Sequence, residues 1–232
     1  ALQREEEDRR HRHHDRQTGP DLDEMSRGVA SRAHDHQVAL VGEGQNERTA
    51  GAVGYGEKGL ADIDRLHAVA RDLKATRDAG HQLVVVVSAM GDTTDRLVEQ
   101  ARQVNPQPPR RELDMLLTVG ERISMSLLCM ALDAVAVPAV SFTGSQAGII
   151  TDCSHTDARI LAVRPIRIPE ELEAGKVVVI AGFQGVCAET KEITTLGRGG
   201  SDTSAVALAH ALGAARCEIL KDVPGVMTAD PK

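Results

Sequence analysis

Aromatic residues are almost absent from this chain: its 232 residues include no Trp, one Tyr and two Phe. The core must therefore be built from Val, Ile, Leu and Ala, which is typical of parallel strands buried beneath helices. Long apolar runs are also missing, and none approaches the roughly 20 residues that a membrane-spanning helix needs. The densely charged N-terminus does not have the form of a signal peptide. We therefore expect no association with a membrane.

Basic charge is in deficit, because 27 Lys and Arg stand against 34 Asp and Glu, for a net charge of −7. No basic block is flanked by aromatic residues, so nucleic acid is not an expected partner. The four cysteines form no CxxC pair and are widely spaced, at Cys129, Cys153, Cys187 and Cys217. That spacing predicts reduced thiols, a cytoplasmic location and no zinc site.

The N-terminal part of the chain differs in composition from the rest. Residues 1–37 are rich in charge, poor in apolar side chains and hold five of the nine histidines. Such a segment cannot bury enough apolar surface to offset the entropy lost on ordering, and its charges are expected to be solvated rather than to bind metal. We predict a disordered or atypical segment over residues 1–50 and one folded domain over residues 51–232.

Apolar periodicity predicts alternating helices and strands from residue 59 onward. Strands are expected at residues 83–87, 139–142, 160–163, 177–183 and 217–220, and residues 38–41 are an ambiguous short strand. Helices are expected from residue 60 to the stop at Gly80, after the run at residues 88–95 as far as about residue 104, over 112–135 and over 201–212. This alternation predicts an α/β protein, a three-layer α/β/α sandwich around a mainly parallel sheet.

Small and polar residues follow several of the predicted strands, and the richest run is Thr194 to Ser204. Its glycines allow a ligand to approach the backbone closely. The helix start that follows offers N–H groups and the positive end of the helix dipole to an anion, and Arg198 adds a bidentate donor. The run predicts a site for a small acidic molecule. An ordinary tight turn, capped by Ser201 or Asp202, is the alternative.

Five runs of sequence connect the chain to a known family. They are residues 84–95, 111–122, 141–148, 181–186 and 194–202. Through them, residues 53–232 resemble the catalytic domain of aspartate kinases of the amino acid kinase family, in particular the actinobacterial type. The resemblance implies the amino acid kinase fold and ATP-dependent phosphorylation of the L-aspartate side-chain carboxylate to 4-phospho-L-aspartate, which opens lysine, threonine and methionine synthesis. It also implies Mg²⁺ as a companion of ATP and a homo-oligomer formed through the kinase domain.

The resemblance assigns roles at the positions that match. L-Aspartate binding falls to Asp92, Thr93, Thr94, Asp95, Glu121, Arg198, Gly199, Gly200 and Ser201, with Glu121 facing the amino group. Nucleotide binding falls to Gly56, Ser88, Asp222, Thr228, Asp230 and Pro231. Asp202 takes a catalytic role by orienting a lysine, and no residue is assigned as a metal ligand.

The chain departs from the family pattern where phosphates are expected. The family lysine near the first strand is replaced by Gly54, and a glycine of the same motif is replaced by Glu57. Loss of one preorganised group that stabilises the transferring phosphoryl costs about 10²–10³ in rate, so we expect impaired activity unless Lys58 supplies the charge. In the C-terminal nucleotide loop, Pro224 removes a carboxylate and an N–H group that the family has, and Met227 replaces the aromatic residue expected near the adenine.

The domain is expected to be incomplete, because the family continues through another helix and strand and then two ACT domains. Two other functions remain open. One is a non-catalytic amino acid kinase domain that binds aspartate or another subunit. The other is a kinase of the same superfamily that acts on glutamate, acetylglutamate or uridylate, although residues 88–95 and 143–146 favour aspartate.

Overall fold

The main sheet of this computed structural model, which describes residues 38–42, 60–197 and 199–220, has the strand order β3-β6-β2-β1-β9. Its strands are β1 (Val38–Gly42), β2 (Val84–Val87), β3 (Ala139–Phe142), β6 (Val177–Ala181) and β9 (Arg216–Leu220). β3, β6 and β2 are parallel, and β1 is antiparallel to both β2 and β9. Four of these five strands therefore run in one direction, which confirms the mainly parallel sheet.

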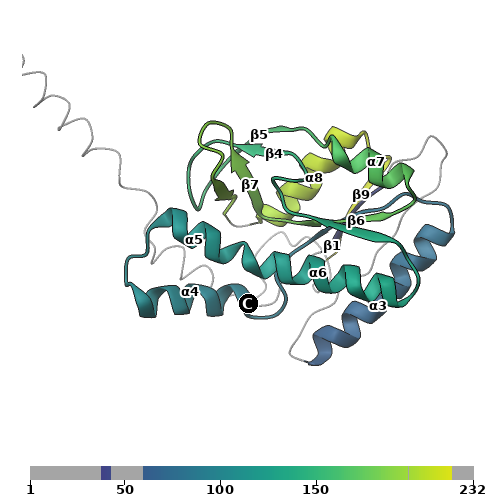
Figure 1. Ribbon diagram of the computed structural model, residues 1–232, viewed down its shortest axis with the longest axis horizontal. Helices are drawn as coiled ribbons and strands as arrows, with labels where there is room; N and C mark the ends of the chain where they lie inside the picture. Colours follow the sequence, from purple (N-terminus) through teal and green to yellow (C-terminus); the bar gives the residue numbers. More distant parts are fainter. Residues whose placement is uncertain (1–37, 43–59, 198, 221–232) are drawn as a thin grey trace, which may run out of the picture. The chain divides into compact units, whose positions relative to one another are not determined.

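Helices cover both faces of this sheet (Figure 1). α3 (Leu60–Asp78) and α6 (Val119–Ala134) pack on one face, and α7 (Arg167–Glu173) and α8 (Gly200–Leu212) pack on the other. β2 shows why, because successive residues of a strand point to opposite faces. Val85 and Val87 join the core with Leu128 of α6, whereas Val84 and Val86 join the core with Leu208 of α8. The predicted three-layer sandwich is confirmed.

A second sheet, with the order β5-β4-β7-β8, was not predicted. Its strands are β4 (Ile149–Thr151), β5 (Ile160–Val163), β7 (Gln184–Cys187) and β8 (Ile193–Thr195). β4 and β7 are parallel, and the two outer strands are antiparallel to their neighbours. Three of these strands, β4, β7 and β8, are not recognised in the sequence because they are three or four residues long and each carries a buried polar residue: Thr151, Gln184 and Thr194.

The single helix predicted over residues 112–135 is two helices, α5 (Arg110–Leu117) and α6, which meet at Thr118. The Thr118 hydroxyl donates to the carbonyl of Met115 at 3.0 Å, a local bond that competes with helical geometry. The Thr118 carbonyl accepts a hydrogen bond of 3.4 Å from the side chain of Gln184. The break therefore follows from side-chain bonding that helix periodicity does not reveal.

By length and hydropathy alone, residues 110–134 form the one helical segment in the described part of the chain that is long and apolar enough to cross a membrane. Half of its most apolar window is buried inside the domain. α6 contacts α3, β3 and β6. This is how a core helix of a sandwich is placed.

The prediction of four reduced cysteines is wrong for one pair, because Cys153 and Cys187 form a disulfide. β4 pairs in parallel with β7 so that Thr151 lies opposite Cys187. The chain turns just after Thr151, and this brings Cys153 to a Cα–Cα distance of 4.8 Å from Cys187. Strand pairing across 34 residues is not visible in the spacing of cysteines, which is why the sequence pointed elsewhere.

The predicted boundary at residue 50 remains a prediction. Within residues 1–50 only β1 is described, and it pairs with β2 and β9. The remainder of that segment lies outside the described residues.

Candidate active site

The first turns of two helices meet at the carboxyl end of β2. The Ser88 hydroxyl donates a hydrogen bond of 2.8 Å to the hydroxyl of Ser201, in the first turn of α8. The backbone N–H of the next residue, Ala89, donates at 3.3 Å to Oε1 of Glu121, in the first turn of α6. Glu121 and Ser201 therefore contact adjacent residues of one short segment. The sequence assigned both to the aspartate side of the site.

Glu121 is a buried carboxyl group, only 4% exposed. Burial raises its pKa from the ordinary 4.5 to about 7, and backbone hydrogen bonds, including the one from Ala89, only partly oppose that shift. Its Oε2 atom has no hydrogen-bond partner within the described residues. A buried carboxylate with one unsatisfied oxygen is stabilised by a cationic group that reaches it.

Gly120 brings the start of α6 against the segment that follows β2. A Cβ atom on Gly120 would lie 2.7 Å from the Cβ of Ala89, and 3.6 Å and 3.7 Å from side-chain atoms of Thr93 and Thr94. Only glycine permits this approach. It is the approach that sets Glu121 beside the Ala89 amide.

Two close contacts and one left-handed residue hold the start of α8. A Cβ on Gly182 would lie 2.7 Å from the Ser201 hydroxyl oxygen, and one on Gly200 would lie 2.8 Å from the Phe183 ring. Gly199 stands at the N-cap with φ of 68°, and no side chain caps the helix there. The α8 N-terminus is thus fixed by the β6–β7 turn and offers backbone rather than a capping side chain to an anion.

The remaining predicted aspartate-site residues lie at the start of α4 (Thr93–Val104). Asp92 is the N-cap residue, and its exposed carboxylate lies 3.9 Å from Arg96. The Thr93 hydroxyl donates to the Met90 carbonyl at 2.6 Å, and Asp95 sits in the first helical turn. Thr93 and Thr94 lie against Gly120, the neighbour of Glu121 in sequence, so the structure places the start of α4 close to the start of α6.

Asp202, the predicted catalytic residue, is half-buried in the first turn of α8. Its negative charge contributes, after partial burial of the thiol, to raising the pKa of Cys217 in β9. The other predicted site residues, Gly56, Arg198, Asp222, Thr228, Asp230 and Pro231, lie outside the described residues.

A buried network centred on Asp114 supports the site and was missed by the sequence analysis. The fully buried Asp114 carboxylate accepts hydrogen bonds from the Thr195 hydroxyl at 2.6 Å and the Thr156 amide at 3.1 Å, and it lies 2.7 Å from Nδ1 of His155. Burial raises the pKa of Asp114 and outweighs these bonds. Nε2 of His155 lies 3.5 Å from the carboxylate of Glu192.

This network joins α5 to the loop at residues 152–159 and to β8, which leads into the glycine turn before α8. Thr156 has a φ of 69°, an uncommon conformation for a β-branched residue, and its amide points at Asp114. The partners are 41 and 81 residues from Asp114 in sequence. No local spacing could have indicated them.

The loops after β3 and β6 also lie together, as expected for parallel neighbouring strands. A Cβ on Gly144 would lie 1.9 Å from the Gln184 carbonyl oxygen, so the loop at residues 143–146 packs directly on the β6–β7 turn.

Comparison with known proteins agrees with this architecture. The amino acid kinase family pattern matches residues 22–232. This chain belongs to the amino acid kinase family. It is 57% identical over 178 residues to the aspartokinases of Mycobacterium tuberculosis (strain H37Rv) and Corynebacterium glutamicum, an alignment that covers 77% of this chain and 42% of each relative. The resemblance to actinobacterial aspartate kinases is confirmed.

A solved structure gives the same result. The crystal structure of aspartate kinase from Synechocystis is 55% identical, covers 66% of this chain and 25% of that chain, and has a TM-score of 0.56. This chain spans about two-fifths of the length of the curated relatives it matches.

Proposed function

We propose that this chain carries the amino-acid-binding and phosphoryl-transfer part of an aspartate kinase. The identity to aspartokinases supports the proposal, and one observation carries it. Glu121 is buried with an unsatisfied Oε2, and its Oε1 accepts from Ala89, the residue next to Ser88, which contacts Ser201. An amino acid carries an ammonium and a carboxylate on the same carbon. Glu121 suits the first, and the N-terminus of α8 suits the second.

In this proposal the α-amino group of L-aspartate binds Glu121. The α-carboxylate binds the backbone at Gly199, Gly200 and Ser201, with Arg198 as a bidentate donor. The segment Asp92–Asp95 lines the side-chain end. An oxygen of the side-chain carboxylate attacks the γ-phosphorus of ATP, the bond to the β-phosphate oxygen breaks, and ADP leaves. The protein contributes positioning and charge stabilisation rather than covalent chemistry.

For the nucleotide, the described residues offer Ser88, at the carboxyl end of β2. Gly56, Asp222, Thr228, Asp230 and Pro231 are proposed as further contacts from their match to the family. No three acidic, histidine or cysteine side chains gather as a metal site among the residues that the structure describes. Mg²⁺ typically binds one or two carboxylates together with substrate phosphates, so we propose that it enters with ATP and neutralises phosphate charge.

A second candidate, a domain that binds aspartate without turnover, is favoured by one feature of the sequence. Gly54 stands at the position of the family lysine, and Glu57 places a negative charge beside it. Asp202 would then have no lysine to orient. The two candidates differ in turnover and agree on binding.

Trapping of aspartyl phosphate by hydroxylamine separates them. The chain is incubated with ATP, Mg²⁺ and L-aspartate, and hydroxamate is measured against reactions lacking aspartate or containing L-glutamate. Glu121→Gln is expected to abolish aspartate binding by calorimetry. Met130→Ala, an exposed position on the same helix, serves as the matched control. Hydroxamate formation supports the kinase, binding without hydroxamate supports the second candidate, and the absence of both contradicts each.

We also propose that the protein is cytoplasmic and forms a homo-oligomer through this domain. The resemblance to aspartate kinases supports the homo-oligomer, and the absence of a CxxC pair supports the location. Light scattering coupled to size-exclusion chromatography measures the oligomer directly. A monomer at all concentrations contradicts that part of the proposal.

A further inference from the structure

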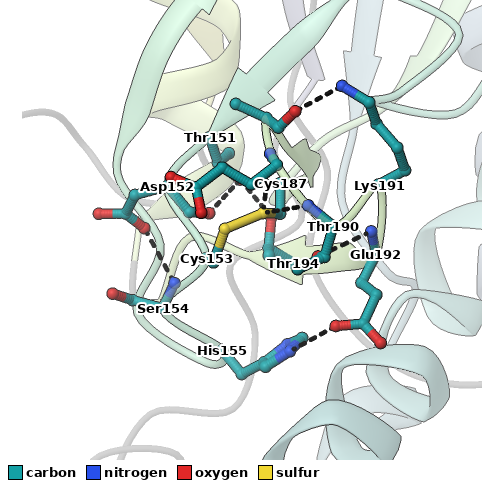
Figure 2. Close-up of a disulfide and its surroundings, with 12 residues drawn as sticks. Thr151, Asp152, Cys153, Ser154, His155, Cys187, Thr190, Lys191, Glu192 and Thr194 are labelled. Carbon is teal, nitrogen blue, oxygen red and sulfur yellow. Dashed lines mark hydrogen bonds and ion pairs between the residues drawn. A yellow bond between two sulfur atoms is a disulfide. The ribbon is translucent and has the colours of Figure 1, made fainter.

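The disulfide between Cys153 and Cys187 joins an exposed residue to a fully buried one (Figure 2 shows the bond and its surroundings). Cys153 lies in an exposed part of the loop at residues 152–159, whereas Cys187 is fully buried at the end of β7. The Cys187 sulfur accepts backbone N–H groups from Glu189 at 3.3 Å and Thr190 at 3.2 Å. The two halves of the bond are therefore chemically unequal.

This inequality suits thiol–disulfide exchange in a fixed order. Because Cys153 is the exposed member of the pair, an incoming thiolate is expected to attack its sulfur, which forms a mixed disulfide and expels the Cys187 thiolate. Two N–H donors stabilise that thiolate, and a stabilised thiolate is a better leaving group. The second thiol of the same reductant then attacks the mixed disulfide and expels the Cys153 thiolate. The reductant ends as a disulfide and both cysteines end as thiols, so electrons and protons balance.

The loop that holds Cys153 also contacts the approach to the candidate active site. The Ala158 amide donates to the Thr195 carbonyl at 2.8 Å. A Cβ on Gly197 would lie 3.2 Å from the Asp157 carboxylate, so this loop packs on the chain just before the glycine turn. At the other end of the disulfide, the backbone amide of Cys187 donates a hydrogen bond of 2.9 Å to the Glu192 carbonyl.

We propose that Cys153 and Cys187 form a reversible redox site for small dithiols and small disulfides, and that its state sets the placement of the glycine turn before α8. The oxidised form clamps the loop at residues 152–159 to β7. Reduction frees that loop to shift against Gly197. The kinetic consequence rests on the proposed function, whereas the exchange chemistry does not.

The other two cysteines are internal controls for the exchange. Cys129 and Cys217 are free, and Cys217 is exposed. Iodoacetamide labelling followed by peptide mass spectrometry is expected to modify Cys217 with or without reductant. Cys153 and Cys187 are expected to be modified only after dithiothreitol, and to be protected again after incubation with glutathione disulfide. Complete labelling of Cys153 after that incubation would overturn the proposal.

The coupling to the site is tested by the KM for L-aspartate in the oxidised and reduced states, with calorimetric affinity as a second readout. Reduction is expected to raise the KM about fivefold, the lower range of coupling between two sites. Cys153→Ser should hold the KM at the reduced value in both conditions, and Cys217→Ser should keep the full response. Equal KM and affinity in both states would overturn the coupling. Normal exchange in a chain that neither binds nor phosphorylates aspartate supports the redox site and contradicts the proposed function.

Discussion

Gly120 and Ala89 are packed so closely that a Cβ on Gly120 would lie 2.7 Å from the Cβ of Ala89. The contact joins the start of α6 to the segment after β2 and sets Glu121 within reach of the Ala89 amide. Gly120 tolerates no side chain and precedes the buried Glu121. We infer that backbone packing, rather than the Glu121 side chain, sets the geometry where α6 meets the segment after β2.

Gly120→Ala is therefore expected to destabilise the protein by about 1–2 kcal/mol, because overcrowding outweighs the better helix propensity of alanine. The shift of the Ala89 amide should also weaken aspartate binding by about tenfold. Urea unfolding and calorimetry measure the two effects. Ser126→Ala, on the same helix, is the control and should change neither by much. A Gly120→Ala protein that is more stable than the wild type would contradict the close packing described for this corner.

Glu121 predicts a specific dependence of stability on pH. Its pKa is about 7 in the folded protein against an ordinary value of 4.5. The folded state therefore holds this proton more tightly, and the free energy of unfolding should fall as the pH rises from 4.5 to 7 and then level off. For a shift of this size the loss is on the order of 3 kcal/mol. Urea unfolding of wild type and Glu121→Gln at pH 5 and pH 7.5 isolates it, because the difference between the proteins removes other titrating groups. Equal pH dependence in both proteins would show that Glu121 is not buried as a neutral acid.

Asp114→Ala should destabilise the protein by about 3 kcal/mol, because it leaves the Thr195 hydroxyl and the Thr156 amide buried without their acceptor. Asp114→Asn keeps an acceptor oxygen and should cost less. Asp133→Ala, an exposed acid on α6, is the control and should lie within about 0.5 kcal/mol of wild type. Chemical denaturation measures all three. If Asp114→Ala matched Asp133→Ala, the network would be a consequence of the packing and not a source of its stability.

The sequence predicted the sandwich because its signals are local. The Val84–Val87 run, the helical spacing of α3 and the Gly80 stop after it each depend on neighbouring residues. In the second sheet β4 pairs with β7 across 36 residues, from Ile150 to Val186, and the Asp114 network joins residues 41 to 81 apart in sequence, where no local pattern exists. The same reason explains the disulfide. For the candidate site, the family motifs assigned Glu121 and Ser201 to aspartate binding, but only the fold shows that both touch the Ser88–Ala89 segment.

The final prediction concerns the positions at which the chain departs from its family. If the phosphate side limits activity, the double substitution Gly54→Lys with Glu57→Gly should raise hydroxamate formation at least tenfold, because it restores a cation and removes an opposing charge. Aspartate affinity should change little, since Glu121 and the start of α8 are untouched. Lys58→Ala tests whether Lys58 already supplies the positive charge of the missing family lysine. A large loss of activity in this variant would show that it does. Unchanged turnover in the double variant, with intact aspartate binding, would mean that the limit lies elsewhere in the phosphate site, for which Pro224 and Met227 are the next positions to restore.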